Sequence, residues 1–367
     1  MSRKTFPLKR RTPLVKAGKS VIYPSDFLVN SITFVNTAQT VHGALLRGGS
    51  RVLVTGGTGF VGSHLLEALA AQGVRIRVLA RRTSETSRLT ALGAEQVEGS
   101  LDDQAALAHA VQGVDTVFHL AAATRARSER EYQQVNAAGT RVLVDAMLGA
   151  LPRPRRLVYL SSLAAAGPAH NGQPVGLQDT PRPITAYGRS KLRGEEVCLA
   201  AAKDLEVVIL RAPAVYGPRD RDLFLCFLLA ARGILPVPQG PERLLQFIHV
   251  NVLVEALLCA AASPQAVGIY HVAEPRSYGW SEITGWIAKA LDRQVRVVRI
   301  PPWVVRVAAA VSEFSAATVG QATILNREKA KELLAPGWLC ETEAAKRDLG
   351  FEGRIPLPAG LSGTAAW

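Results

Sequence analysis

A tyrosine and a lysine stand four residues apart in the segment Tyr187-Gly188-Arg189-Ser190-Lys191. On a helix, positions i and i+4 share one face, so this spacing predicts that the phenol and the ammonium are neighbours. A nearby cation favours phenolate, and we therefore expect Lys191 to bring the pKa of Tyr187 down toward working pH. Such a tyrosine can exchange a proton with an alcohol or a carbonyl oxygen. The alternative is an exposed helix face, because this spacing is common by chance.

A glycine-rich turn separates the apolar stretch Arg51–Thr55 from a helical stretch, Gly59–Gln72. Glycine lets the chain turn tightly and lets backbone N–H groups approach a pyrophosphate at the positive end of the helix. The motif lies between a strand and a helix, which is the context that a dinucleotide site requires. The residues of this turn that we expect to bind the cofactor are Gly56, Gly57, Thr58, Gly59, Phe60, Val61 and Gly62.

Two arginines follow the next predicted strand. An enzyme that uses NAD usually offers an acid to the ribose 2′-hydroxyl about 20 residues after the glycines. Here that segment holds Arg81 and Arg82, and the first acid is Glu85. Two guanidiniums suit a 2′-phosphate better than a bare diol. NADP(H) is therefore the favoured cofactor, and NAD(H) is the alternative if both arginines are solvated surface residues.

Further motifs accompany the glycine turn and the tyrosine–lysine pair along the chain. They are His119–Ala122 after a strand, Asn136 opening a helix with Gly139 and Thr140, Ser161–Ser162 at a strand end, and Ala214–Pro218. With these motifs the chain, from about Arg51 to Gly360, resembles the extended short-chain dehydrogenase/reductases, the superfamily of NAD-dependent epimerases and dehydratases. Within it, the segment Ser161–Pro168 looks like the 3β-hydroxysteroid dehydrogenase and dihydroflavonol-reductase-like branches.

The resemblance implies a catalytic set and further cofactor contacts. Ser162 would hydrogen-bond the substrate oxygen, Tyr187 would transfer the proton, and Lys191 would hold the nicotinamide ribose and tune the tyrosine. Asn136 would help to organise the site. The bland alternatives are a strand-end serine for Ser162 and a helix cap for Asn136. The other expected cofactor contacts, besides Tyr187 and Lys191, are Leu101, Leu120, Ala121, Ala122, Pro213 and Val215.

The chain departs from the family pattern where other members bind adenine or a diphosphate. After the third strand it has Gly99-Ser100 instead of Gly-Asp, and we interpret the nearby Asp102 as a turn residue. Sugar-nucleotide epimerases commonly carry Asn and Arg where this chain has Ala214 and Leu245. Losing a charge-assisted phosphate donor is costly, so a nucleotide sugar is disfavoured, unless Arg243 reaches in by a shift of register.

The substrate expectation rests on apolar character. Pro301–Leu325 is interrupted by only two charges, Arg306 and Glu313, and could form an apolar lid, a membrane-interface helix or a packed helix. The leading interpretation is therefore an NAD(P)-dependent oxidoreductase that moves hydride between nicotinamide and an apolar or lipid-like secondary alcohol or ketone. The alternatives are a nucleotide-sugar epimerase/dehydratase that retains its cofactor and a non-catalytic cofactor-sensing protein.

Short strands rich in Val, Ile and Leu alternate with helices, which predicts an α/β fold with a doubly wound parallel sheet (Rossmann fold) and a smaller C-terminal substrate-binding lobe. Residues 51–218 with 247–267 would form the NAD(P)-binding domain, and 219–246 with 268–360 the lobe. Residues 1–49 are expected to be a disordered basic extension. The predicted strands are Arg51–Thr55, Arg75–Ala80, Gln96–Glu98, Thr116–Leu120, Arg156–Leu160 and Val207–Leu210, and the later helices are Gln104–Val111, Asn136–Ala150 and Ala186–Ala202.

Charge and cysteine content bear on partners and compartment. Of the net charge of +13, residues 1–50 contribute eight Lys/Arg against the single acid Asp26, so the remainder is only mildly basic. That balance suits an anionic cofactor and a small-molecule substrate, with no nucleic acid. Four scattered cysteines predict no disulfide framework and no metal site. We expect a cytoplasmic protein without a spanning helix or secretory signal, with peripheral membrane contact and a homodimer as further options.

Overall fold

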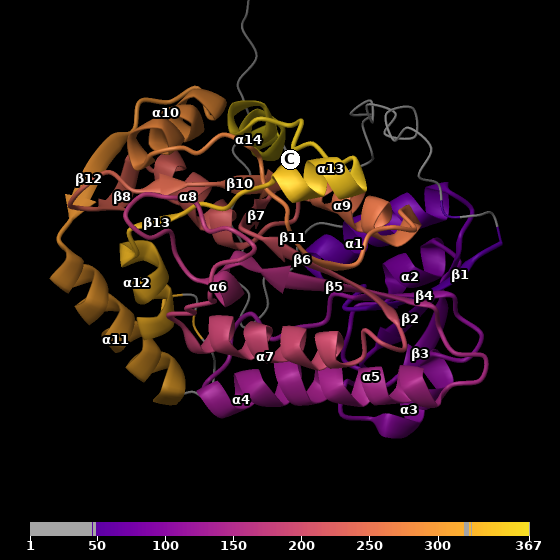
Figure 1. The fold of residues 1–367 in the computed structure, drawn as a ribbon. Helices are drawn as coiled ribbons and strands as arrows, with labels where there is room; N and C mark the ends of the chain where they lie inside the picture. The colour runs from indigo at the N-terminus through magenta and orange to yellow at the C-terminus, as the bar shows by residue number, and fades with distance from the viewer. Residues whose placement is uncertain (1–45, 47–48, 319–322, 324, 367) are drawn as a thin grey trace, which may run out of the picture. The chain divides into compact units, whose positions relative to one another are not determined.

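Seven strands pair in parallel to form the main sheet of the computed structural model (Figure 1), with the order β11-β6-β5-β4-β1-β2-β3. The structure describes residues 46, 49–318, 323 and 325–366, so the predicted extension 1–49 lies outside the described residues except at positions 46 and 49. This sheet confirms the predicted fold class. Its strands are β1 (Arg51–Thr55), β2 (Arg75–Ala80), β3 (Glu95–Glu98), β4 (Thr116–His119), β5 (Arg156–Ser162), β6 (Glu206–Ala212) and β11 (Gly268–His271).

Helices cover both faces of this sheet, which explains why its central strands are apolar throughout. One hydrophobic core joins the inner side chains of α3, α5 and α7 to those of β1, β5 and β6. Figure 1 shows these helices on one side of the sheet and α1, α9 and α13 on the other. The helices of the two layers are α1 (Phe60–Ala71), α3 (Gln104–Ala110), α5 (Gly139–Gly149), α7 (Ala186–Ala200), α9 (Val250–Ala262) and α13 (Glu343–Leu349), with the shorter α2 (Ser87–Ala91), α4 (Glu129–Gln133) and α6 (Leu163–Ala166) in the connections.

The last strand of the main sheet begins at Gly268, where the second part of the predicted lobe also begins. The predicted lobe included Gly268, but β11 pairs in parallel with β6, with Gly268 opposite Val208 and His271 opposite Arg211. A four-residue strand carries too little pattern to be recognised from sequence, yet it covers the edge of β6, which would otherwise be unpaired. The division of the chain into a cofactor domain and a substrate lobe stays a prediction.

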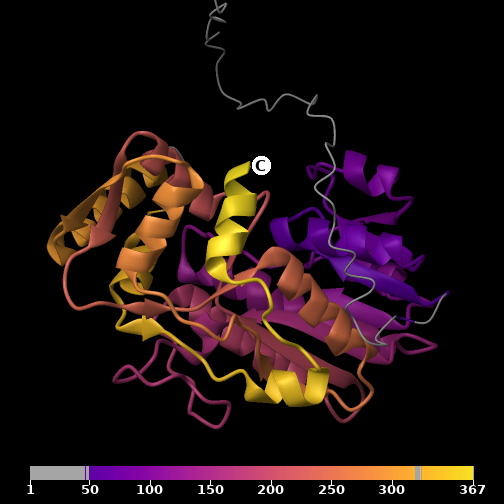
Figure 2. The same cartoon turned by 90° about the horizontal axis from the view of Figure 1, so that it is seen from above.

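A second group of elements follows β6 and has a hydrophobic core of its own, which includes Tyr216, Phe227, Tyr278 and Leu357. Figure 2 shows its orange elements at the side of the view opposite the indigo strands. Three two-stranded parallel ladders belong to it. Its elements are β7 (Ala214–Tyr216) with β10 (Phe247–His249), β8 (Ile234–Pro238) with β12 (Arg296–Ile300), β9 (Leu244–Leu245) with β13 (Gly337–Trp338), and the helices α8 (Asp222–Ala231), α10 (Trp280–Ala290), α11 (Pro302–Thr318), α12 (Arg327–Leu334) and α14 (Leu357–Ala366).

The helix start predicted at Asn136 is wrong. The helical segment already begins at α4, where the Ser128 hydroxyl caps it by accepting from the Glu131 N–H at 3.2 Å. Asn136 lies inside a π-helical turn, η2 (Gln134–Ala138), that leads into α5. Such single π-turns within helices are frequent at functional sites.

Among the described residues, no helix is long and apolar enough to cross a membrane.

Candidate active site

The glycine turn between β1 and α1 leaves no room for side chains. Gly56 has a φ of +75°, and a Cβ added to it would lie 2.6 Å from the backbone nitrogen of Ala121. A Cβ on Gly62 would lie 2.1 Å from the carbonyl oxygen of Gly56. The turn, the first turn of α1 and the end of β4 therefore approach to backbone contact, which only glycine permits.

The N-terminus of α1 is open to an anion. Its N-cap is Gly59, which has no side chain to cap the helix, and its first turn contains no acidic residue. The first N–H groups of a helix lack intrahelical partners and carry the positive end of the helix dipole. The cradle built by the glycines, open at this helix end, therefore fits the pyrophosphate of a dinucleotide.

A histidine joins the strand ends beneath the glycine turn. The Nδ1 atom of His119 lies 2.7 Å from the Thr55 hydroxyl, and its Nε2 atom lies 2.9 Å from the Thr140 hydroxyl. Burial lowers the pKa of His119 to about 3, with a further contribution from Lys191. The neutral ring thus links β1, β4 and α5, and the Thr55 hydroxyl also accepts from the Ala121 N–H at 3.3 Å.

Arg81 and Arg82 follow the carboxyl end of β2, beside the glycine turn. The two ends lie close together, because a Cβ on Gly57 would lie 2.9 Å from a methyl group of Val78 in β2. Both arginines are exposed. In the part of the chain that the structure describes, neither has an ion-pair partner, so both guanidiniums are available to a ligand.

Ser162 and Tyr187 lie together. Ser162 ends β5 and caps α6 by accepting from the Ala164 N–H at 3.2 Å. Tyr187 lies in the first turn of α7, and Gly188 allows that turn to rest on α6, since a Cβ there would lie 2.2 Å from the Ala164 carbonyl oxygen. Burial raises the pKa of Tyr187, and its hydrogen bond with Ser162 opposes that rise.

The pKa of Tyr187 is raised by burial and is not lowered by Lys191 as expected. The Nζ atom of Lys191 donates to the Leu160 carbonyl oxygen at 2.8 Å and lies 4.0 Å from the centre of the Tyr159 ring. Burial lowers the pKa of Lys191 to about 7, whereas the Glu195 carboxylate raises it. Lys191 is not among the groups that shift the pKa of Tyr187. Tyr187 and Lys191 share a helix face, but the Lys191 ammonium hydrogen-bonds the end of β5.

This buried lysine should make the stability of the cofactor-free protein depend on pH. The unfolded chain keeps Lys191 protonated up to its ordinary pKa of 10.5, whereas the folded protein releases the proton near pH 7. Between these values the unfolded state binds more protons, so this residue makes stability rise with pH. The Lys191→Met variant should therefore have a higher free energy of unfolding than wild type. This difference should be largest at pH 6 and should shrink toward pH 10. Urea unfolding at pH 6, 8 and 10 measures this, and a difference independent of pH would contradict it.

Asn136 connects the loop after β4 to α7. Its Oδ1 atom accepts from the Ala123 N–H at 2.7 Å, and its Nδ2 atom donates to the Ala123 carbonyl oxygen at 3.0 Å. The same Nδ2 atom donates to the Ser190 hydroxyl at 2.9 Å. Ser190 lies within the motif that carries Tyr187 and Lys191. Asn136 is buried and can therefore hold the positions of both segments.

The other predicted cofactor residues follow the carboxyl ends of strands of the main sheet. Leu120, Ala121 and Ala122 follow β4 and are partly buried, as are Pro213 and Val215, which flank the exposed Ala214. Leu101 packs against the start of α5, where a Cβ on Gly139 would lie 2.7 Å from its own Cβ. Asp102 lies in the adjoining turn, where its carboxylate accepts from the Ser100 hydroxyl.

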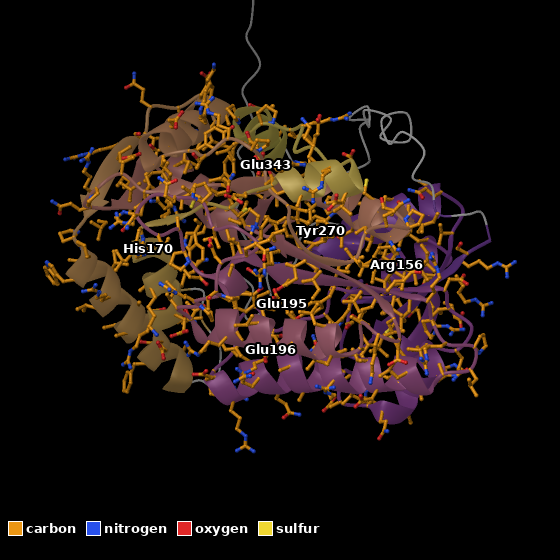
Figure 3. The ribbon with its side chains drawn as sticks, viewed as in Figure 1. Arg156, His170, Glu195, Glu196, Tyr270 and Glu343 are labelled. Atoms are coloured by element: carbon orange, nitrogen blue, oxygen red, sulfur yellow. The ribbon has the colours of Figure 1, made fainter. Side chains whose placement is uncertain are left out.

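An ion pair behind the site escaped the sequence analysis. Glu195 and Arg211 are both buried, and their closest atoms are 2.7 Å apart. Glu195 also accepts from the Ser161 hydroxyl at 2.5 Å, next to Ser162. Figure 3 shows Glu195 on the sheet side of α7 and Glu196 on the opposite side. The signal in the sequence was its position four residues after Lys191, which places both on one helix face.

The parallel sheet, the glycine cradle, the serine at the end of β5 and the tyrosine and lysine on α7 define a nicotinamide-dependent enzyme with a Rossmann fold. The model of the NAD dependent epimerase/dehydratase family matches residues 52–273. The chain belongs to this family, which confirms the class of enzyme that the sequence predicted.

Individual relatives narrow the comparison. The chain is 32% identical over 320 residues to "Ceramide reductase" of Caulobacter vibrioides. The matched region covers 86% of this chain and 93% of the relative. It is 29% identical over 237 residues to "Sterol-4-alpha-carboxylate 3-dehydrogenase, decarboxylating" of Dictyostelium discoideum, with 62% and 72% covered. This second similarity supports the predicted likeness to the 3β-hydroxysteroid dehydrogenase branch. The solved structure of MoeE5 with UDP-glucuronic acid and NAD is similar with a TM-score of 0.68 and 26% identity, covering 87% of this chain and 98% of that one.

Proposed function

We propose that the enzyme transfers hydride in a net reaction between NADP(H) and an apolar, lipid-like ketone or secondary alcohol. The observation that carries this proposal is the meeting of Ser162 and Tyr187 at the sheet edge that also holds the glycine cradle and Lys191. The apolar substrate class is supported by the names of the relatives, one called a ceramide reductase and one a sterol dehydrogenase. It is also supported by the apolar residues at the places where nucleotide-sugar enzymes carry phosphate donors.

The roles of the side chains follow from their surroundings. When bound, the nicotinamide cofactor supplies or accepts the hydride. Burial keeps Tyr187 protonated, so in the reducing direction its hydroxyl can give a proton to the substrate oxygen as negative charge develops there. The Ser162 hydroxyl holds the same oxygen. Lys191 would hold the nicotinamide ribose, and Asn136 would position the loop and the helix on either side.

The competing function is a nucleotide-sugar epimerase or dehydratase that retains its cofactor, and the similarity to MoeE5 favours it. The second core disfavours it, because Leu245 packs there and offers no charge where a diphosphate donor is expected. A register shift that would bring in Arg243 is also disfavoured. Leu245 exchanges two backbone hydrogen bonds with Tyr278, at 2.8 and 2.9 Å, and Leu244 pairs with Gly337.

A panel of substrates separates the two functions. The purified protein is mixed with NADPH or NADH and, in turn, with long-chain keto amides, 3-ketosteroids and nucleotide sugars. Stoichiometric loss of reduced nicotinamide with an apolar ketone is the expected result. A nucleotide sugar converted without net loss of cofactor would establish the epimerase function and overturn the argument from Ala214 and Leu245.

The preference for NADP(H) should depend on Arg81 and Arg82. Changing both to alanine removes two charge-assisted hydrogen bonds to a 2′-phosphate, each worth about 1.5–3 kcal/mol. The dissociation constant for NADPH should rise by at least roughly 100-fold, while that for NADH changes little. Arg75→Ala, at the exposed amino end of the same strand, is the matched control. Equal losses for both cofactors would refute the assignment.

We further propose a cytoplasmic enzyme that contacts membranes peripherally. All four cysteines, Cys198, Cys226, Cys259 and Cys340, are unpaired, which suits a reducing compartment. The homodimer implied by the family resemblance stays a prediction.

A further inference from the structure

The outward face of α11 is apolar. Trp303, Val307, Val311 and Phe314 are 66%, 54%, 59% and 73% exposed. Their spacing of four, four and three residues places them in one stripe along the helix, about 16 Å long. A surface helix normally shows the reverse arrangement, with its large apolar side chains turned toward the core.

The inward face of α11 holds smaller residues. Ala309 is fully buried, and Val305 and Ser312 are half-buried. The helix packs on α12 and lies at the outer margin of the fold in Figure 1. Scattered exposed apolar residues are ordinary, but a continuous stripe that includes a tryptophan and a phenylalanine indicates an interaction surface.

Several arginines precede or accompany the stripe in the sequence. Arg293, Arg296 and Arg299 lie in or just before β12, which leads directly into α11, and Arg306 lies on α11 itself. All four are exposed, and none has an ion-pair partner within the described ranges. Residues 292–318 contain only two acids, Asp292 and Glu313, and Glu313 pairs with Arg327. The segment 293–314 therefore combines an apolar stripe with exposed arginines that have no ion-pair partner among the described residues.

We propose that α11 docks the enzyme on an anionic lipid bilayer. The stripe enters the boundary between headgroups and acyl chains, and the arginines contact lipid phosphates. A second copy of the chain fits less well, because a two-fold contact through α11 would bring the unpaired guanidiniums of both copies together, and like charges at an interface are costly. One helix face is also small beside the roughly 1,200–2,000 Å² that stable protein interfaces bury.

The docked face is linked to the active site through α12. The Glu328 carboxylate of α12 accepts from the Ala186 N–H, one residue before Tyr187. Glu332, one turn further along α12, contributes to the raised pKa of Tyr187. A bilayer on the outward face of α11 would thus be connected through α12 to α7, the helix that carries Tyr187. Delivery of an apolar substrate from that bilayer rests on the proposed function, whereas the docking itself does not.

The test is sedimentation of the full chain with vesicles of phosphatidylcholine alone or with phosphatidylglycerol. Val307→Ser with Phe314→Ser removes half of the stripe, and Leu151→Ser with Val267→Ser changes two exposed apolar residues elsewhere as the matched control. We expect the stripe variant to lose at least roughly tenfold in partitioning into anionic vesicles, and the control to keep it. Arg296→Gln with Arg299→Gln should lose roughly tenfold or more, since each arginine near the surface counts separately. Equal partitioning of all variants would overturn the proposal.

A second readout separates α11 from the basic residues 1–50. Brominated lipids quench tryptophans that enter the bilayer, so they should quench wild type and lose most of that effect in Trp303→Phe, which keeps an apolar ring and should keep binding. Unchanged quenching in that variant would assign the binding to another segment. A dimer that the stripe variant dissociates in light scattering would replace the lipid by a second copy. Ketone turnover in detergent, measured in parallel, tests the proposed function independently of docking.

Discussion

Tyr187→Phe should lower kcat by about 10²–10⁴-fold and leave the affinity for the cofactor within a few-fold of wild type. The substitution removes only the hydroxyl that bonds with Ser162, and the ring stays in its place 6.0 Å from the ring of Tyr132. The glycine cradle is untouched, so binding of the dinucleotide should not depend on the hydroxyl. Steady-state turnover of a ketone and fluorescence titration with NADPH measure the two quantities separately.

Tyr132 provides the control for this experiment. Its hydroxyl donates to the Thr124 carbonyl oxygen at 3.4 Å. Tyr132→Phe removes the same atom from a neighbouring ring and should reduce kcat only slightly. If Tyr187→Phe retained more than a tenth of wild-type turnover, or if both variants lost activity equally, Tyr187 would not be the proton donor.

Arg211→Met should lower the free energy of unfolding by about 3–5 kcal/mol. The substitution leaves the Glu195 carboxylate buried without its cation, and its remaining polar partner is the Ser161 hydroxyl. Changing both members, Arg211→Met with Glu195→Leu, should restore most of the loss, because neither member of the pair is then left buried without its partner. Urea unfolding of the three proteins measures these differences.

An exposed pair on the same helix is the matched control. Arg193 and Glu196 lie 2.8 Å apart on the solvent side of α7, and Arg193→Met should cost less than about 1 kcal/mol. A double variant as unstable as Arg211→Met alone would show that packing rather than the buried charge decides the loss.

Local patterns predicted the elements that position the site. The apolar runs of β1 and β2 have the predicted bounds, and β5 and β6 extend beyond the predicted bounds by one or two residues. The meeting of Ser162 with Tyr187 follows from a motif at the carboxyl end of β5 and a second motif at the start of α7. The strand bounds depend on neighbours in sequence. The contact between Ser162 and Tyr187 depends on the parallel arrangement of strands, which the alternation of strands and helices indicates.

Features that depend on long-range packing could not be predicted. β11 is recognisable only through its pairing with β6. The partner of Glu195 lies on a different strand, at Arg211. The hydrogen bond from Lys191 to the Leu160 carbonyl oxygen depends on where β5 ends in space. The spacing of Lys191 from Tyr187, in contrast, can be read from the sequence. In each case the deciding contact joins residues from different elements.

A net hydride transfer to an apolar carbonyl can be followed directly with an isotope label on the cofactor. The enzyme is mixed with NADPH carrying two deuterium atoms at C4 and with the most active ketone, and the product is analysed by mass spectrometry after one turnover. We expect one deuterium on the carbinol carbon for each cofactor oxidised, and almost none with Tyr187→Phe. Unlabelled alcohol, or a nucleotide sugar converted while the cofactor is regenerated, would contradict it.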